Sequence, residues 1–227
     1  MRPATPPVPR ELDAREEHLR EVPVESAQVL EGSFLQVFRD QARLSNGSLV
    51  QREYIRHPGA VMVVPLLADE RFVMERQFRY PLQQVLLEFP AGKIDRGEPP
   101  FLTGQRELFE ETGYRAQEWA LAGRLHNAAA YSDEFIEIWF ARGLQPGAAQ
   151  LDADELLEVC EVSLATLRQL AADGELTDAK TQIGLLWLEH LAAGRWKPRW
   201  QSAGQWCAEL GIAAERGTSM KQAGVQP

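Results

Sequence analysis

The sequence contains only two cysteines, Cys160 and Cys207, among its 227 residues. Two thiols form neither the disulfide framework of small secreted domains nor a zinc site with four cysteine ligands. The four histidines also lack the spacing of a zinc site. We therefore interpret both cysteines as inert thiols in a reducing cytoplasm.

Long apolar segments are lacking as well. The longest run, Val61–Ala68, is far shorter than the ~20 residues that a membrane-spanning helix needs. The N-terminal stretch MRPATPPVPR has no apolar core of the kind found in a secretory signal. These absences predict a cytoplasmic protein that does not act at a membrane.

Positive charge is in deficit, with 24 lysines and arginines against 33 acidic residues and a net charge of −9. Such a protein repels phosphate backbones at long range, so a broad nucleic-acid surface is not expected. A small anionic substrate remains possible where local cations receive it. Hydrophobic residues make up 44% of the chain, as is typical of a globular protein.

The first 57 residues are expected to form an appendage to the main domain. Residues 1–27 are rich in proline, glutamate and arginine and show no clear period, which predicts a loose arm with a short helix near Leu12–Leu19. Residues 28–57 look like strands, and Asn46-Gly47 is a strong hairpin signal. A small hairpin is marginal alone, so it must pack on the main domain or on a second subunit.

Residues 58–195 are expected to form the main domain, with an α/β fold in which helices cover a mixed sheet. A helix is predicted between Pro99-Pro100 and Gly113, and two more after the capping residues Ser163 and Asp178. Strands are predicted at four further segments: Val61–Leu67, Val85–Phe89, Ile136–Phe140 and Glu158–Val162. Residues 196–227 form a C-terminal tail, whose three tryptophans are expected to pack back on the domain.

Three glutamates dominate the predicted helix before Gly113. Glu107, Glu110 and Glu111 are spaced i, i+3, i+4, so they share one face and repel one another. A bound cation offsets this repulsion, and carboxylates without a neighbouring cysteine or histidine favour Mg²⁺ or Mn²⁺. Taken by itself, the same spacing also fits a solvated acidic face. Gly92 is expected to let the preceding backbone bend so that a carbonyl faces the metal.

The full pattern decides between these alternatives. It comprises Gly92, five residues, Glu98, seven residues, and then Arg106-Glu107-Leu108-Phe109-Glu110-Glu111-Thr112-Gly113. This is the Nudix box, and the sequence resembles the Nudix hydrolases. The resemblance implies an α/β/α sandwich and divalent-metal hydrolysis of a nucleoside diphosphate linked to another group.

The resemblance also implies roles for individual residues. Glu107 and Glu111 resemble the main metal ligands, helped by the carbonyl of Ala91, and Glu110 resembles a third ligand or a water-orienting base. Arg106 is expected to hold the glutamates in place by charge-assisted hydrogen bonds, with Glu98 closing the loop toward it. Bound metal lowers the pKa of water and neutralises diphosphate oxygens.

Features outside the box resemble the ADP-ribose and ADP-sugar pyrophosphatases of the family. They include the segment Glu88–Asp95, which reads EFPAGKID, and Gln77-Phe78-Arg79-Tyr80. The resemblance makes Arg79 a phosphate contact and Glu134 a substrate-contacting carboxylate. A solvated arginine at a strand end is the alternative for Arg79.

In that group, an N-terminal strand segment exchanges between subunits of a dimer and completes the site. Arg52 and Glu53 stand where relatives contact ligand, and Phe34 matches an aromatic that stacks on adenine, although an ordinary strand residue fits equally. Ala129 occupies a position that is usually proline in ADP-ribose enzymes. This departure leaves other ADP-sugars, GDP-sugars or a broader range open.

A second acidic cluster includes Asp152, Asp154 and Glu155. A solvated loop is one interpretation. In the relatives, a glutamate from a mobile loop just before a strand acts as a general base or additional metal ligand, which makes Glu155 the candidate here, with Asp154 and Asp152 behind it.

The resemblance therefore predicts a homodimeric, Mg²⁺-dependent hydrolase that cleaves an ADP-sugar to AMP and a sugar 5-phosphate. One alternative is a Nudix-fold nucleotide-binding regulator without catalysis. Another is a pyrophosphatase for a different substrate, such as a GDP-sugar or NADH.

Overall fold

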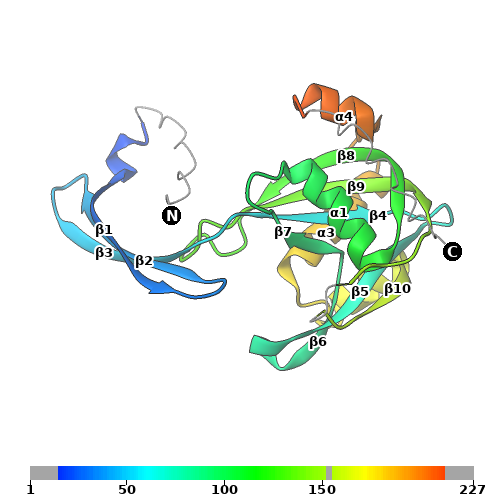
Figure 1. The fold of residues 1–227 in the computed structure, drawn as a ribbon, viewed down its shortest axis with the longest axis horizontal. Helices are drawn as coiled ribbons and strands as arrows, with labels where there is room; N and C mark the ends of the chain where they lie inside the picture. The colour runs from blue at the N-terminus through cyan, green and yellow to red at the C-terminus, as the bar shows by residue number, and fades with distance from the viewer. Residues whose placement is uncertain (1–14, 152–154, 213–227) are drawn as a thin grey trace, which may run out of the picture. The chain divides into compact units, whose positions relative to one another are not determined.

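The structure is a computed structural model that describes residues 15–151 and 155–212. The strands of the described chain (Figure 1) are β1 (Glu21–Glu31), β2 (Gln36–Leu44), β3 (Leu49–Arg56), β4 (Ala60–Pro65), β5 (Arg71–Arg79), β6 (Gln84–Glu88), β7 (Ala91–Lys93), β8 (Arg115–Leu125), β9 (Ile136–Gln145), β10 (Leu157–Ser163) and β11 (Gln201–Ser202). The helices are α1 (Pro100–Thr112), α2 (Leu164–Ala172), α3 (Ala179–Ala192) and α4 (Ala203–Glu209), with short 3-10 helices at Glu17–Leu19 and Tyr80–Leu82.

The chain divides into two compact units. The N-terminal unit comprises the residues up to His57 together with Ala128–Asp133, and the main unit comprises Pro58–Asn127 and the residues from Glu134 onward.

The N-terminal unit is a three-stranded antiparallel sheet in the order β1-β2-β3. The turn between β2 and β3 lies at the predicted Asn46-Gly47, where Gly47 has a φ of +87° and the Asn46 side chain accepts a hydrogen bond from Ser48 N–H. Phe38 stacks on Tyr54 with 5.9 Å between ring centroids. The predicted hairpin is therefore confirmed.

The prediction of an unstructured arm through residue 27 is wrong. β1 begins at Glu21 and pairs with β2 along most of its length, although every residue of β1 is exposed. Its mixture of charged residues and Pro23 hid the strand, because no alternation of apolar residues marks it. Phe34 lies outside the strands, since β2 begins only at Gln36.

The main unit holds two sheets. A mixed sheet has the order β11-β8-β9-β4-β7, in which β4 and β9 run parallel and the other neighbours antiparallel. A second, antiparallel sheet has the order β10-β5-β6.

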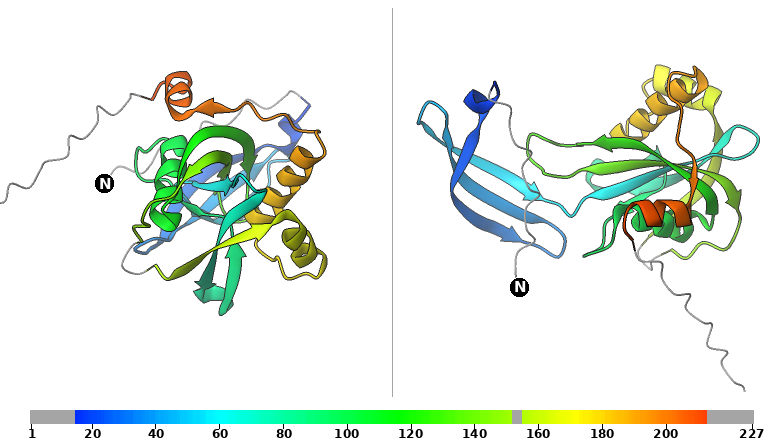
Figure 2. Two further views of the ribbon diagram at one scale, coloured as in Figure 1. Left: turned by 90° about the vertical axis from the view of Figure 1, so that its right-hand side faces the viewer. Right: turned by 90° about the horizontal axis from the view of Figure 1, so that it is seen from above.

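β4 is buried on both faces and separates two apolar layers. Val61 and Val63 pack in a cluster with α1 and α4, whereas Met62 and Val64 pack in a cluster with α2 and α3. Figure 2 shows α1 and α3 on opposite sides of the mixed sheet. The predicted α/β/α sandwich with a mixed sheet is confirmed.

Local signals located α1, α2 and α3 of the main unit well. Ser163 and Asp178 cap α2 and α3 by accepting hydrogen bonds from the N–H groups of Thr166 and Thr181. Sequence patterns missed β8, which is held by its pairing with β9. They also missed α4, although Ser202 and Gln205 form a capping box at its start. Trp206 of α4 is buried and donates to the carbonyl of Trp119, so this tryptophan packs back as expected.

Within residues 15–151 and 155–212, no helix combines the length and the apolar character needed to cross a membrane.

Candidate active site

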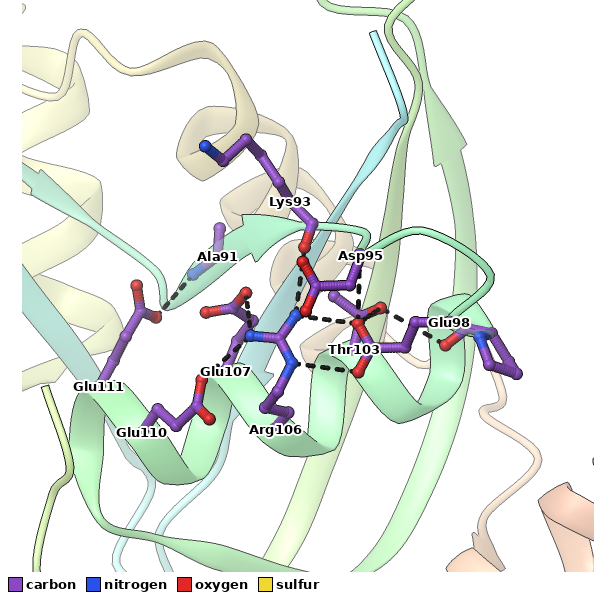
Figure 3. Close-up of polar contacts among 10 residues, drawn as sticks. Ala91, Lys93, Asp95, Glu98, Thr103, Arg106, Glu107, Glu110 and Glu111 are labelled. Carbon is purple, nitrogen blue, oxygen red and sulfur yellow. Dashed lines mark hydrogen bonds and ion pairs between the residues drawn. The ribbon is translucent and has the colours of Figure 1, made fainter. Parts of the chain in front are cut away.

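Helix α1 presents the three glutamates predicted from the sequence. Pro100 begins it, and Gly113, at φ +76°, ends it by donating its N–H to the carbonyl of Phe109 at 2.8 Å. Phe101 and Leu108 are buried against the sheet, which orients the helix. Glu107, Glu110 and Glu111 consequently face β7 and the loop after it (Figure 3).

Arg106 joins the acidic residues into one network (Figure 3). Its guanidinium donates to both carboxylate oxygens of Glu98 at 3.0 and 2.9 Å, to Glu107 at 2.8 Å and to Glu110 at 3.0 Å. It also donates to the backbone carbonyl of Lys93 at 3.2 Å. The structure therefore contains the contacts between Arg106 and the glutamates that the sequence predicted.

Glu98 anchors this network at the start of α1. It accepts a hydrogen bond from the Thr103 hydroxyl at 2.7 Å and one from the Asp95 N–H at 3.3 Å. Burial raises the pKa of Glu98, but the hydrogen bonds from Arg106 and Thr103 outweigh it and hold that pKa below its usual value. Glu98 is therefore an ionised clamp on the arginine.

Gly92 has a different role from the one expected. Its φ is not positive, so the position requires no unusual backbone bend. A Cβ added there would lie 2.0 Å from the carboxylate carbon of Glu107. Glycine is needed because the Glu107 carboxylate lies directly against the backbone of β7.

Ala91 contacts Glu111 through its N–H, which donates to the carboxylate at 3.0 Å. This bond fixes Glu111 beside β7. The predicted role of the Ala91 carbonyl as a metal ligand stays a prediction.

Burial makes this group of carboxylates electrostatically costly. It raises the pKa of Glu107 to about 7 and is also the largest cause that raises the pKa of Glu111. The charge of Glu155 also contributes to raising both pKa values, and its predicted role as the loop base stays a prediction. Asp152 and Asp154 lie outside the described residues.

These carboxylate oxygens fit a hard divalent cation. Burial disfavours the ionised form of Glu107 and Glu111, and a bound cation stabilises that form. Glu107 and Glu111 are almost fully buried, and Glu110 is more exposed. Within the described ranges, no group of three or more acidic, histidine or cysteine side chains is already arranged as a metal centre. Arg106 holds Glu107 and Glu110 instead.

A second charged group lies where β5 meets β6, and sequence analysis missed two of its members. Glu75 and Glu88 are cross-strand neighbours and both are fully buried. Glu88 receives two hydrogen bonds from Arg79 at 2.7 Å and another from Lys180 of α3. The available sequence signal for Glu75 was its place directly after the apolar run Phe72–Met74; nothing local marked Lys180.

The residues predicted to bind substrate fall in both units. Arg79 and Glu134 belong to the main unit, and Arg79 is held by Glu88. The other four residues belong to the N-terminal unit: Phe34, Arg52, Glu53 and Ala129. Within that unit, Arg52 pairs with Glu21, and Glu53 pairs with Arg39.

A cleft of about 370 Å³ opens in the main unit beside the predicted loop base. Arg76, Phe78 and Val85 line it from β5 and β6, and Glu155 lines it from the loop before β10. A lining that combines apolar side chains with charged ones suits a ligand that has both an apolar part and polar groups.

The NUDIX domain family matches residues 56–183 of this chain, and this match covers more than half of it. The chain therefore belongs to the Nudix family. The match includes all of α1, the Arg106 network and the Glu75–Glu88 pair.

Particular relatives give a narrower comparison. The chain is 34% identical to the ADP-ribose pyrophosphatase of Bacillus subtilis over 173 residues, which cover 75% of this chain and 94% of the relative. It is 35% identical to the methanol dehydrogenase activator of Bacillus methanolicus, over 73% of this chain and 91% of that protein. A solved structure titled as an ADP compounds hydrolase superposes with a TM-score of 0.67 at 24% identity, covering 86% of this chain and 97% of that one, which shows the shared fold.

Proposed function

We propose that this protein is a Mg²⁺-dependent Nudix hydrolase that cleaves the diphosphate bond of ADP-ribose or a related ADP-sugar into AMP and a sugar 5-phosphate. The observation that carries the proposal is the buried group of carboxylates on α1, organised by Arg106 within a complete Nudix box. The similarity to a relative named ADP-ribose pyrophosphatase supports the substrate class.

Glu107, Glu110 and Glu111 are the proposed metal ligands, with the Ala91 carbonyl and Glu155 completing the set. A divalent ion held there supplies charge neutralisation of the diphosphate and a lowered pKa for water. Mn²⁺ has the same ligand preference and is expected to substitute.

Arg106 and Glu98 are proposed to keep the ligands in place. The guanidinium spans Glu98, Glu107 and Glu110, so the carboxylates converge without the full cost of their repulsion. Such preorganisation contributes to catalysis because the site does not need to rearrange during the reaction.

Arg79 is proposed to bind a substrate phosphate. Glu88 holds two of its N–H groups, and the arginine side chain is 37% exposed, so part of the guanidinium faces outward. Phe34, Arg52, Glu53, Glu134 and Ala129 are proposed as further substrate contacts, those of the N-terminal unit acting in a homodimer. We place the protein in the cytoplasm, in keeping with its two free cysteines.

A substrate panel tests the proposal. Purified protein is incubated with Mg²⁺ and ADP-ribose, ADP-mannose, GDP-mannose or NADH, and the products are separated by chromatography. Release of AMP from an ADP-sugar as the fastest reaction supports the proposal. Faster hydrolysis of GDP-mannose or NADH indicates a pyrophosphatase for a different substrate, which is the alternative raised by Ala129. Nucleotide binding without hydrolysis across the panel favours a regulator.

A further inference from the structure

Glu75 is a buried carboxylate whose surroundings do not satisfy it. It lies in β5, the central strand of the β10-β5-β6 sheet, and its side chain is fully buried. Among the described residues, neither of its carboxylate oxygens has a hydrogen-bond partner. A buried carboxylate in this condition costs several kcal/mol unless a proton or a cation compensates it.

The hydrogen bonds of the two neighbouring cations, Arg79 and Lys180, go to carboxylates other than Glu75. Arg79 gives both of its bonds to Glu88, and Lys180 donates to Glu88 and Asp178. Glu88 is therefore the carboxylate that these cations satisfy. Glu75 stands beside it across the strand pair, with Val159 of β10 as its other neighbour.

The strand register places Glu75 on the side of the site where Glu111 is held. Glu111 accepts a hydrogen bond from the Ala91 N–H at 3.0 Å. Ala91 lies three residues beyond Glu88, which is the cross-strand neighbour of Glu75. In agreement with this placement, burial is the largest cause that raises the pKa of Glu111 and the charge of Glu75 is the next.

We propose that Glu75 is a further oxygen ligand of the divalent cation held by Glu107, Glu110 and Glu111. The inference rests on the proposed metal site of α1 and extends it to a residue from the sheet. A hard cation between Glu75 and Glu111 satisfies two buried carboxylates at once, and oxygen ligands of this kind suit Mg²⁺ and Mn²⁺. Such a role explains why an ionisable side chain follows three buried apolar residues in β5 and is itself buried.

Mn²⁺ binding tests the inference without any substrate. Free Mn²⁺ is measured by electron paramagnetic resonance during titration of the native protein and of Glu75→Gln, which keeps the size of the side chain but removes its charge. Glu158→Gln is the matched control, because Glu158 is an exposed carboxylate on β10 that pairs with Arg76. We expect Glu75→Gln to bind Mn²⁺ at least about tenfold more weakly and Glu158→Gln to bind like the native protein.

Two failures are distinguishable. If the native protein binds Mn²⁺ and Glu111→Gln abolishes binding while Glu75→Gln binds as tightly as native, the inference on Glu75 is overturned and the proposed function stands. If the native protein itself binds no Mn²⁺, the proposed metal site and the inference fail together.

Glu75→Asp provides a second test that preserves the charge. The side chain is one methylene shorter, so a directly ligating carboxylate loses its reach, whereas a distant charge acts as before. Weaker Mn²⁺ binding by Glu75→Asp, with a smaller rise in Tm on metal addition than in the native protein, supports ligation. Native affinity and a native rise in Tm overturn it.

Discussion

At the scale of single residues, the candidate site depends on close approach more than on charge alone. Glu107 lies against β7 only because residue 92 lacks a side chain. Arg106 then holds Glu107 and Glu110 on one side, while the Ala91 N–H holds Glu111 on the other. Small changes at these contacts are expected to have large effects on activity.

Gly92→Ala tests the close approach. The added methyl group meets the Glu107 carboxylate and displaces it, so we expect the rate of ADP-ribose hydrolysis to fall by ~10² or more. Gly204→Ala in α4 is the control, because a Cβ there meets nothing within 4 Å and alanine favours a helix. Steady-state kinetics of both variants make the measurement, and native activity in Gly92→Ala would contradict this role.

Glu98→Gln tests the clamp on Arg106 through its pH dependence. The lowered pKa of Glu98 means that its ionised form stabilises the native state above the ordinary pKa of 4.5 and that this stability is lost as pH falls through the lowered value. We expect the variant to be about 1–2 kcal/mol less stable at pH 7 and the difference to shrink below pH 4.5.

Urea unfolding at several pH values measures this difference. Glu118→Gln is the control, because Glu118 pairs with Arg142 at the surface and exposed pairs contribute little. A difference between Glu98→Gln and the native protein that is the same at every pH would show that Glu98 acts without its charge.

At the scale of elements, local signals predicted α1, α2 and α3, whereas β8 and α4 were missed. α1 was predicted at both ends by Pro100 and Gly113, and α2 and α3 by their capping residues. β8 was missed because its sequence, RAQEWALAGRL, mixes apolar and polar residues without a clear strand alternation. The strand is held by its pairing with β9. The Nudix box likewise revealed Glu107, Glu110 and Glu111, which share one helix.

The residues that sequence analysis missed come from other elements. Glu75 and Lys180 reach the same region from β5 and α3, more than a hundred positions apart in the chain. Only the pairing of β5 with β6 and the packing of α3 against the sheet bring them together. No pattern within one element contains that information.

Lys180→Met tests how α3 is joined to the sheet. The change leaves the buried Glu88 with Arg79 but without its second cation. Breaking a buried pair in this way costs about 3–5 kcal/mol. Arg168→Met is the control, because it breaks a more exposed pair with Glu189 and is expected to cost less than about 1 kcal/mol. Urea unfolding compares the two variants, and equal effects would contradict the structural role of the buried pair.

At the scale of the whole molecule, the N-terminal unit stands out because few of its apolar side chains are buried. Among its described residues, from Arg15 onward, the buried apolar side chains are Phe38 and Ala42, whereas apolar residues of β1, including Val22, Val24 and Leu30, are exposed. A sheet with so small a core is marginal by itself. This supports the proposal that the unit is completed by a second copy of the chain.

Sedimentation velocity tests the homodimer. We expect a single species with twice the chain mass of 25.5 kDa over a wide range of protein concentrations. A species of 25.5 kDa throughout that range would contradict the dimer and with it the proposed contribution of Arg52 and Glu53 from a partner.

The central claim is that the carboxylates of α1 bind a divalent cation for cleavage of a diphosphate. The most direct measurement is the initial rate of AMP release from ADP-ribose, as a function of Mg²⁺ concentration, in the native protein and in Glu111→Gln. We predict a metal-dependent rate in the native protein and a loss of ~10³ or more in the variant, equivalent to about 4 kcal/mol of barrier. A rate in Glu111→Gln within a few-fold of native would contradict the account.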